Sequence, residues 1–165
     1  MHIIPAQEDR HATAMLAIFN HEIAHTTALY EVEPRSPQHM ADWFAHKVAG
    51  GWPVIVAEDE HGHLLGFASY GTFRAYPAFE HTVEHSVYVA LPHQRRGVGR
   101  ALMQRLIQQA HDDGMHVMVG AIDSSNTASV ALHQALGFQR VGHLRETGHK
   151  FGRWLDLLFY QRTLP

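Results

Sequence analysis

Apolar residues recur along the chain with two different spacings, and each spacing predicts one kind of element. Apolar positions three and four residues apart between Met15 and Ile23 indicate a helix with one buried face. A second pattern of this kind opens at Ser36 and Pro37, a pair typical of a helix N-cap and first turn. The same spacing predicts two further helices, at about residues 97–111 and 127–136.

Runs rich in β-branched and aromatic residues lie between these helices and predict strands. The first is a short stretch around Ile3 and Ile4. Charged residues and Gly62 in the segment 58–63 are typical of a hairpin turn, so we expect the runs on either side of it to pair antiparallel. The remaining expected strands cover residues 53–57, 64–70, 81–90, 116–123, 138–144 and 151–161.

The order of these elements predicts the fold class. It reads β-α-α-β-β-β-α-β-α-β-β, which indicates an α/β fold with a mixed central sheet of about six to seven strands flanked by helices. The 165 residues, 45% of them apolar, suffice for one well-filled core, and no repeat or low-complexity tract interrupts them. We therefore expect a single domain over residues 1–165.

Charge and cysteine content exclude several classes of function. The chain has 13 Lys and Arg against 16 Asp and Glu, so it lacks the basic field that binds nucleic acid or a membrane surface. An anionic ligand must then be bound locally. The absence of cysteine excludes disulfides, thiolate zinc sites and a cysteine nucleophile. With neither a leader pattern nor an apolar run of membrane-spanning length, we expect a cytoplasmic protein.

A turn with two glycines and three arginines lies between the expected strand 81–90 and the helix that follows it. Glycines let the backbone approach a ligand closely, and the first N–H groups of a helix attract anions. Arginines add donors suited to a pyrophosphate or a 3′-phosphate. The turn lacks the third glycine of a Rossmann turn and the lysine of a nucleotide-binding P-loop. A helix cap beside surface arginines is the alternative.

Residues 94–102, QRRGVGRAL, resemble the acetyl-CoA pyrophosphate signature of the GNAT superfamily of N-acetyltransferases. Asn126 and residues 131–138, ALHQALGF, are similar to the second signature of that superfamily. Three further stretches resemble, more narrowly, the phosphinothricin and methionine sulfoximine or sulfone acetyltransferases; they are residues 27–31 (TALYE), 82–89 (TVEHSVYV) and 148–154 (GHKFGRW). The matches occur in one order and span nearly the whole chain.

The resemblance implies a GNAT-like fold with acetyl-CoA as co-substrate. It also implies that the strand before the arginine-glycine turn pairs with the pantetheine arm as an added strand does. The residues that it assigns to coenzyme A are Val87, Tyr88, Val89, Arg95, Arg96, Gly97, Val98, Gly99, Arg100 and Asn126.

Glu84 is the candidate general base. The two-residue period of strand 81–90 places it on one face with Ser86 and Tyr88, and places His85 and Val87 on the other. The pattern alone also fits a solvated strand face or a structural ion pair, whereas the resemblance assigns this position to the base. An α-ammonium group must lose a proton before it attacks a thioester, and a carboxylate accepts that proton directly or through water.

His133 stands where many superfamily members have a tyrosine beside the departing thiolate. The narrower resemblance makes it a candidate to hydrogen-bond the sulfur. The alternative is a histidine on the helix surface without a catalytic role. Asn126 opens the same helix and suits its N-cap, besides the contact with coenzyme A that the resemblance assigns to it.

Arg74, in an aromatic-rich loop before the Glu84 strand, is the candidate for the carboxylate of an amino-acid-like acceptor, because arginine binds carboxylates bidentately. The alternative is a solvated loop arginine. Peptide amino termini, polyamines and a non-catalytic acyl-CoA sensor stay open as other functions, and the resemblance suggests a homodimer. The candidate acceptor residues are Arg74, Ala75, Tyr76, Glu84, His85 and Ser86; four residues matching the narrower family, with a pocket or subunit-contact role left open, are Tyr30, Glu31, Lys150 and Trp154.

His21 and His25 flank Glu22 in the H-E-x-x-H pattern of zinc proteases, inside an expected helix. The continuation that supplies a third ligand does not follow, and 16 histidines in 165 residues make a chance match common. We therefore expect ordinary helix histidines and no metal, with a zinc hydrolase as the alternative.

Overall fold

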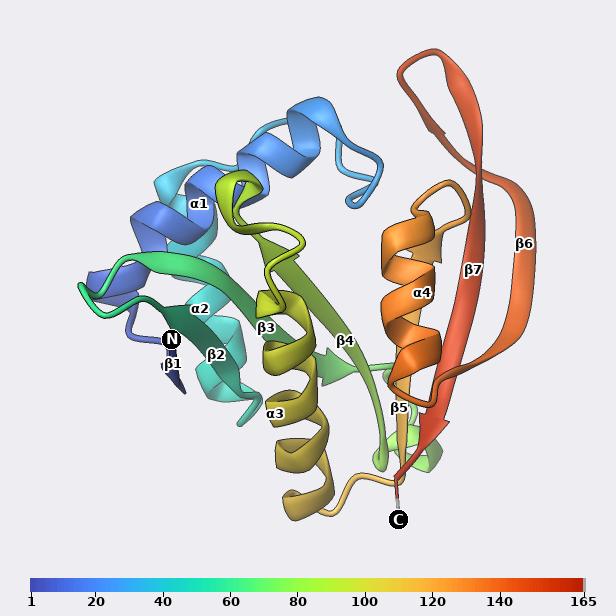
Figure 1. The fold of residues 1–165 in the computed structure, drawn as a ribbon. Helices are drawn as coiled ribbons and strands as arrows, with labels where there is room; N and C mark the ends of the chain where they lie inside the picture. Colours follow the sequence, from blue (N-terminus) through green and yellow to red (C-terminus); the bar gives the residue numbers. More distant parts are fainter. Residues whose placement is uncertain (165) are drawn as a thin grey trace.

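A seven-stranded mixed sheet runs through the structure, a computed structural model that describes residues 1–164. The strand order is β1-β2-β3-β4-β5-β7-β6, and only β4 and β5 pair in parallel. Helices cover both faces of this sheet (Figure 1). The elements are β1 (His2–Pro5), α1 (Glu8–His25), α2 (Pro37–Ala49), β2 (Val54–Glu58), β3 (Leu64–Thr72), η1 (Pro77–Phe79), β4 (Thr82–Val89), η2 (Leu91–His93), α3 (Val98–Asp112), β5 (Val117–Asp123), α4 (Thr127–Ala135), β6 (Gln139–Lys150) and β7 (Arg153–Thr163).

The predicted fold class and element order are confirmed, including the antiparallel pairing of β2 with β3. The predicted limits of the last two strands are wrong. Strand β6 continues past Leu144 to Lys150, and β7 begins at Arg153. This end of the hairpin is mostly exposed and carries polar residues, and Glu146 adopts a left-handed φ of 53° where the register shifts. Apolar alternation is therefore absent exactly where the strand continues.

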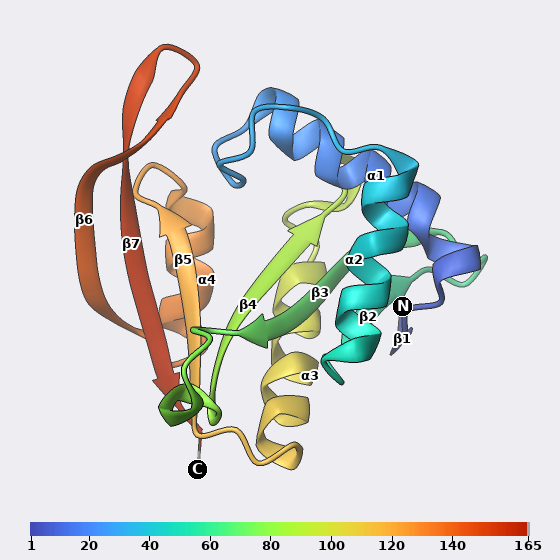
Figure 2. The same ribbon diagram turned by 180° about the vertical axis from the view of Figure 1, so that it is seen from behind.

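Two apolar clusters hold the helices against opposite faces of the sheet. On one face, Met15 and Phe19 of α1 and Met40 of α2 pack with Phe67 of β3. On the other face, Leu102 and its neighbours on α3 pack against the sheet, together with residues around α4. In the reverse view of Figure 2, α1 and α2 lie in front of the sheet. The sheet thus separates two layers of helix, each with its own core.

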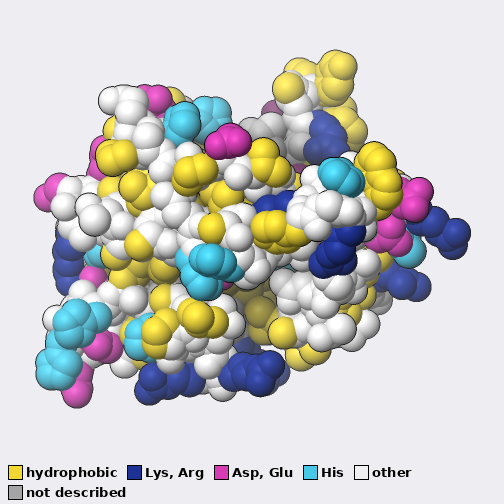
Figure 3. Space-filling view, turned by 90° about the horizontal axis from the view of Figure 1, so that it is seen from above, with side chains coloured by type: hydrophobic (Ala, Val, Ile, Leu, Met, Phe, Trp, Pro, Cys, Tyr) yellow, Lys and Arg dark blue, Asp and Glu magenta, His cyan; other side chains and the backbone are white. Residues whose placement is uncertain are grey.

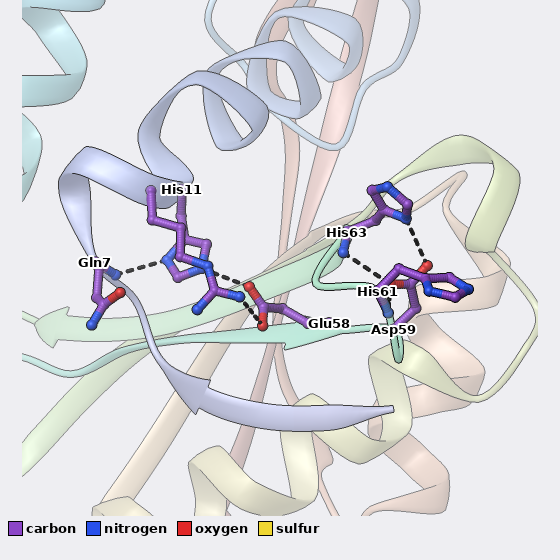
Figure 4. A network of polar contacts seen from close by, with 7 residues as sticks. Gln7, His11, Glu58, Asp59, His61 and His63 are labelled. Atoms are coloured by element: carbon purple, nitrogen blue, oxygen red, sulfur yellow. Dashed lines mark hydrogen bonds and ion pairs between the residues drawn. The ribbon is translucent and has the colours of Figure 1, made fainter.

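A buried histidine attaches the start of α1 to β2 (Figure 4). His11 Nδ1 accepts the backbone N–H of Gln7 at 2.8 Å, so its Nε2 carries the proton and donates to Glu58 Oε1 at 2.8 Å. Arg10 donates to the other oxygen of Glu58 at 2.7 Å. In the following turn, Asp59 accepts the backbone N–H groups of His61 and His63. The rings of His11 and His63 thus each contact a nearby carboxylate, Glu58 and Asp59 respectively.

Within residues 1–164, no helix is both long enough and apolar enough to cross a membrane.

Candidate active site

The strands β4 and β5 separate soon after they begin. Their parallel pairing covers only three pairs, from Thr82 with Val117 to Glu84 with Val119. Beyond that point β4 stays paired with β3, whereas β5 stays paired with β7 as far as Asp123. Figures 1 and 2 show the two strands diverging from their paired end. From Glu84 onward, one edge of β4 has no strand beside it.

The free edge of β4 presents backbone groups of alternate residues. The N–H of Ala90 donates to Leu65 O on β3, and in an antiparallel pair alternate residues face opposite sides. The backbone groups of Val87 and Val89 therefore face the gap, while those of Tyr88 face β3. Gln94 Nε2 donates to Val89 O at 3.2 Å, which agrees with this assignment. A ligand entering the gap meets the same pattern that an added strand would meet.

The turn before α3 places free N–H groups at the open end of this gap. Arg95 and Gly97 both adopt left-handed φ angles, 59° and 82°, and α3 begins at Val98. No side chain caps this helix, so its first N–H groups are free for an anion. Gly97 suits this backbone because a residue with Cβ is strained at a positive φ. The predicted helix start at Gly97 is its N-cap in the structure.

A cavity of about 700 Å³ joins the free edge of β4 to this turn, a size typical of ligand sites. Figure 3 looks down on this end of the molecule and shows a recess near the middle of the face, with Lys or Arg side chains beside it. Most residues predicted for coenzyme A line the cavity; they are Val87, Tyr88, Val89, Arg95, Gly97, Gly99, Arg100 and Asn126. Val98 is instead buried in the core, and exposed Arg96 lies 3.4 Å from His93 Nδ1.

A second cavity, of about 70 Å³, lies along the gap toward Glu84. It is also lined by Ser86, His85 and His133, and the residues that it shares with the larger cavity are Ala28, Val87, Tyr88, Asn126 and Ser129. The gap between β4 and β5 is thus hollow from the arginine-glycine turn to the residues next to Glu84.

Glu84 stands at the last pair of β4 with β5, where the gap begins. Its side chain is about a third exposed, and its Oε2 lies 3.8 Å from Arg74 Nη1. Burial raises the pKa of Glu84, and the charge of Arg74 offsets part of that rise. A carboxylate with a raised pKa is a better proton acceptor than a fully solvated one. The sequence left open a solvated strand face or an ion pair for Glu84. Its partial exposure and its contact with Arg74 each agree with one of these two descriptions.

The loop around Arg74 flanks Glu84 on the side away from the larger cavity. The Arg74 guanidinium stacks on the ring of Phe73, 4.2 Å from its centre, and is half exposed. Ala75 and Tyr76 are exposed beside it. None of these three residues lines the two cavities described above. Together with Glu84, Arg74 presents one positive and one negative group at the closed end of the gap.

His133 is buried, so the alternative of a histidine on the surface of α4 is wrong. Its Nδ1 lies 2.7 Å from Ser129 O, and its Nε2 lies 3.1 Å from Nε2 of His85. Burial lowers the pKa of His133 and lowers that of His85 to about 3. The ring of His85 faces α4, on the opposite side of β4 from Glu84.

Asn126 caps α4, because its side-chain oxygen accepts the N–H of Ser129 at 3.1 Å. It also lines both cavities. The two roles left open by the sequence are therefore compatible in one side chain.

Three hydrogen bonds join the segment after α1 to the ends of β5 and β6. Lys150 is buried, and its Nζ donates to the carbonyl oxygens of Thr26 and Leu29 at 2.8 and 2.6 Å. The hydroxyl of Tyr30 donates to Asp123 Oδ2 at 3.0 Å. Trp154, by contrast, is exposed. Lys150 and Tyr30, for which a pocket or a subunit-contact role was left open, thus make hydrogen bonds within their own chain.

Phe151 in the β6–β7 turn and Arg153 at the start of β7 line the larger cavity and were not among the predicted site residues. Both belong to the stretch 148–154, which carries part of the family resemblance. That resemblance was the one signal in the sequence that could have identified them as site residues. Because both residues are far along the chain from most other site residues, local patterns do not predict that they line the same cavity.

The zinc-protease pattern has a structural explanation in α1. The rings of His21 and His25 are 4.9 Å apart, as neighbours one helical turn apart are. Glu22 between them is buried, and its Oε2 accepts the hydroxyl of Thr26 at 2.7 Å. Across residues 1–164 no three His, Cys, Asp or Glu side chains are grouped as metal ligands.

The split parallel strand pair and the uncapped helix behind the arginine-glycine turn leave one long cavity with a free strand edge and free helix N–H groups. The chain belongs to the acetyltransferase (GNAT) family, whose model matches residues 15–138. It is an acetyl-CoA-dependent N-acetyltransferase.

Named relatives align over most of the chain. An L-methionine sulfoximine/L-methionine sulfone acetyltransferase from Pseudomonas paraeruginosa is 45% identical over 150 residues, covering 91% of this chain and 87% of the relative. An L-amino acid N-acyltransferase from Escherichia coli is 46% identical over 151 residues, covering 92% and 87%. A phosphinothricin acetyltransferase from Sinorhizobium meliloti, solved with acetyl-CoA, superimposes with a TM-score of 0.95 at 34% identity, covering 99% and 88%.

Proposed function

We propose that the protein transfers the acetyl group of acetyl-CoA to the α-amino group of a small amino acid of the methionine sulfoximine, methionine sulfone or phosphinothricin type. The observation that carries this proposal is the position of Glu84, 3.8 Å from Arg74 at the closed end of the gap. A base and a carboxylate-binding group next to each other suit an acceptor that carries an amine and a carboxylate on one carbon. The names of the relatives supply the class of side chain.

The anion-binding turn and the free edge of β4 hold the donor in this proposal. Arg95, Arg100 and the first N–H groups of α3 bind the pyrophosphate. The backbone groups of Val87 and Val89 pair with the amide groups of the pantetheine arm. These contacts direct the thioester toward Glu84 without using a side chain that takes part in the chemistry.

Glu84 supplies the base in the reaction. The carboxylate takes a proton from the acceptor ammonium, and the amine then attacks the thioester carbonyl, forming a C–N bond. The oxygen of the tetrahedral intermediate takes on negative charge, which a backbone N–H at the free edge of β4 stabilises. The C–S bond breaks as the carbonyl re-forms, and coenzyme A leaves as a thiolate. The attacking nitrogen releases its second proton to solvent, which leaves a neutral amide.

Arg74 holds the carboxylate of the acceptor. Its guanidinium is half exposed and stacked on Phe73, so it is available to a ligand yet restricted in orientation. Ser86 lies on the same face of β4 as Glu84, and Tyr76 extends the loop beside it. A polyamine lacks the carboxylate that Arg74 would bind, and the positive charge of Arg74 disfavours it.

An acceptor screen with acetyl-CoA and detection of the free thiol tests the proposal. The acceptors are methionine sulfone, methionine sulfoximine, phosphinothricin, spermidine and a short peptide with a free amino terminus. We expect turnover with the first three. Turnover with spermidine or the peptide alone would contradict the acceptor class, and binding of acetyl-CoA without any turnover would favour a sensor.

Replacing the base separates chemistry from binding. Glu84→Gln is expected to bind acetyl-CoA as the parent does, while turnover falls by about 10² or more. Glu80→Gln is the matched control, because Glu80 lies four residues earlier and is exposed. Unchanged turnover in Glu84→Gln would remove this residue from the mechanism.

We extend the proposal to a homodimer that forms through the β6–β7 hairpin. Strand β6 is an edge strand of 12 residues, and Val141, Leu144 and Trp154 are exposed large apolar residues on this hairpin. Such an edge favours association with another chain. Light scattering is expected to give the mass of a dimer, and Leu144→Glu to reduce it to that of one chain. A parent protein with the mass of one chain would contradict the extension.

The proposed reaction assigns no step to a metal ion. Acetyl transfer is expected to persist after dialysis against a chelator, with zinc analysis of the purified protein as the companion measurement. Stoichiometric zinc together with chelator-sensitive turnover would contradict this assignment and return His21 and His25 to consideration.

A further inference from the structure

Two buried histidines face each other beside the gap between β4 and β5. His85 of β4 and His133 of α4 are 7% and 2% exposed, and their Nε2 atoms are 3.1 Å apart. Their rings are nearly parallel, and Phe138 packs edge-on against both. Both rings also line the smaller cavity, but little of either is exposed, so their ring protons are set mainly by partners within the protein.

The partners of His133 determine where its proton lies. Its Nδ1 is 2.7 Å from Ser129 O, and a carbonyl oxygen only accepts, so Nδ1 carries the proton. Neutral His133 then has a bare Nε2. That atom can only accept, and the group in front of it is Nε2 of His85.

The same reasoning fixes the proton of His85. Its Nε2 must donate to the bare Nε2 of His133, which leaves its own Nδ1 without a proton. Consistent with this, Nδ1 of His85 is a buried atom with no hydrogen-bond partner among residues 1–164. An acceptor left unpaired is easier to bury than a charged ring. The pair is therefore neutral, with one proton between the two Nε2 atoms and one held by Ser129.

The backbone opposite leaves room for the pair. A Cβ at Gly120 of β5 would lie 2.8 Å from Nε2 of His85 and 3.0 Å from Nε2 of His133. The two rings thus fill the space over β5 directly after its last pair with β4. They separate the strands at the position where the gap opens.

We propose that His133 is a positioning residue, which accepts the N–H of His85 and so holds the free edge of β4 at Val87 in place for the donor. It transfers no proton to the departing thiolate, because its one proton is held by Ser129 and its free lone pair is occupied. The thiolate leaves as an anion and takes its proton from solvent. This inference rests on the proposed function for the identity of the leaving group.

Two replacements of His133 separate positioning from acid catalysis. The side-chain oxygen of Gln can accept the N–H of His85, but its amide has no proton to release at neutral pH. His133→Gln is therefore expected to keep kcat within about threefold of the parent, with the same shape of pH profile. An acid catalyst contributes about 10² to 10⁴ in rate, so a loss of 10² in kcat with an unchanged KM for acetyl-CoA would overturn the proposal.

In His133→Leu the new side chain fills a similar volume but has no acceptor, so the N–H of His85 is left buried and unpaired. We expect KM for acetyl-CoA to rise by about tenfold, the factor that a loss of 1.4 kcal/mol gives, with a smaller change in kcat. An unchanged KM in a folded Leu variant would contradict the positioning role. If the Leu variant does not fold, the Gln variant decides the question by itself.

Nitrogen NMR of the ¹⁵N-labelled full chain reads the protons directly. Long-range correlations at pH 7 are expected to show neutral His133 with the proton on Nδ1 and neutral His85 with the proton on Nε2, each assigned by the loss of its signals in the Gln variant of that residue. A charged His133, or one with its proton on Nε2, would overturn the proposal. The measurement needs no turnover, so it stays informative even if the acceptor screen fails.

Discussion

The hydroxyl of Tyr30 donates to Asp123 Oδ2 at 3.0 Å, and this bond joins the segment after α1 to the end of β5. The Tyr30 ring lies so close to Gly148 that a Cβ there would be 2.6 Å from Cε2 of the ring. Lys150 holds the same segment through Thr26 and Leu29. Because this segment also lines the larger cavity, these contacts connect the two halves of the split sheet across the donor site.

Removing this hydroxyl should loosen the connection without disturbing the packing of the ring. Tyr30→Phe is expected to lower the free energy of unfolding by about 1–2 kcal/mol, since the bond goes to a carboxylate. KM for acetyl-CoA should rise several-fold, because Thr27 and Ala28 line the cavity. Urea denaturation and steady-state kinetics check both effects. Equal stability and equal KM in the two proteins would mean that the bond has no role in either.

The left-handed turn can be tested with two matched glycines. Gly97 and Gly114 have φ angles of 82° and 74°, and a Cβ at either would meet nothing within 4 Å. Alanine at each position should therefore cost a similar strain, about 1 kcal/mol in the free energy of unfolding. Only Gly97→Ala should also raise KM for acetyl-CoA, because Gly97 lines the cavity and Gly114 ends α3 elsewhere. A rise of KM in both variants would indicate a general effect of instability.

The pH dependence of turnover should respond to the charge next to the base. Arg74 lowers the pKa of Glu84, so Arg74→Gln should raise that pKa. The base form of Glu84 is lost as pH falls through its pKa, and the acid limb of kcat/KM should therefore move to higher pH. KM for the amino-acid acceptor should rise by about tenfold, while KM for acetyl-CoA stays the same.

Arg105→Gln, on the exposed side of α3, is the control for this experiment. It should leave the pH profile and both KM values unchanged. A shift of the acid limb to lower pH in Arg74→Gln would contradict the assignment of Glu84 as the titrating base.

Packing beside the two buried histidines leaves no space for a methyl group. Gly120→Ala should lower the free energy of unfolding by about 1–3 kcal/mol, because its Cβ would lie 3.0 Å or less from two ring nitrogens. Gly142→Ala on edge strand β6 is the control, since its nearest contact would be an ordinary 3.4 Å. Equal stability of the two variants in urea denaturation would show that the rings adjust without cost.

The sequence was sufficient to predict the fold class, and most of the residues that it suggested for coenzyme A line one cavity. Each helix buries one face and the inner strands are almost continuously buried, so apolar spacing and apolar runs located these elements. The arginine-glycine turn was identified by its composition and its position before a helix. The far end of the β6–β7 hairpin could not be located, because residues 145–150 are mostly exposed and do not alternate. Exposed strand positions accept polar residues on both faces, so they lack the apolar spacing that marks a strand.

The environment of single side chains was harder to predict than their position. His133 follows a helical pattern that fits a surface or a buried site equally well, and only the ring of His85 beyond it decides the matter. Arg153 reaches the cavity from the start of β7, which is distant in sequence from most other lining residues. Such contacts depend on how the sheet folds back on itself, which local spacing does not record.

Because one edge of β4 is unpaired, the stability of the folded chain should depend on the concentration of the acetyl donor that binds there. In the free protein the amides of Val87 and Val89 lack a strand partner, so they should exchange with deuterium faster than their neighbours that face β3. A donor bound along this edge protects them and, since it binds only the folded chain, raises the melting temperature with its concentration. Cells rich in acetyl donor would therefore contain a longer-lived enzyme than starved ones.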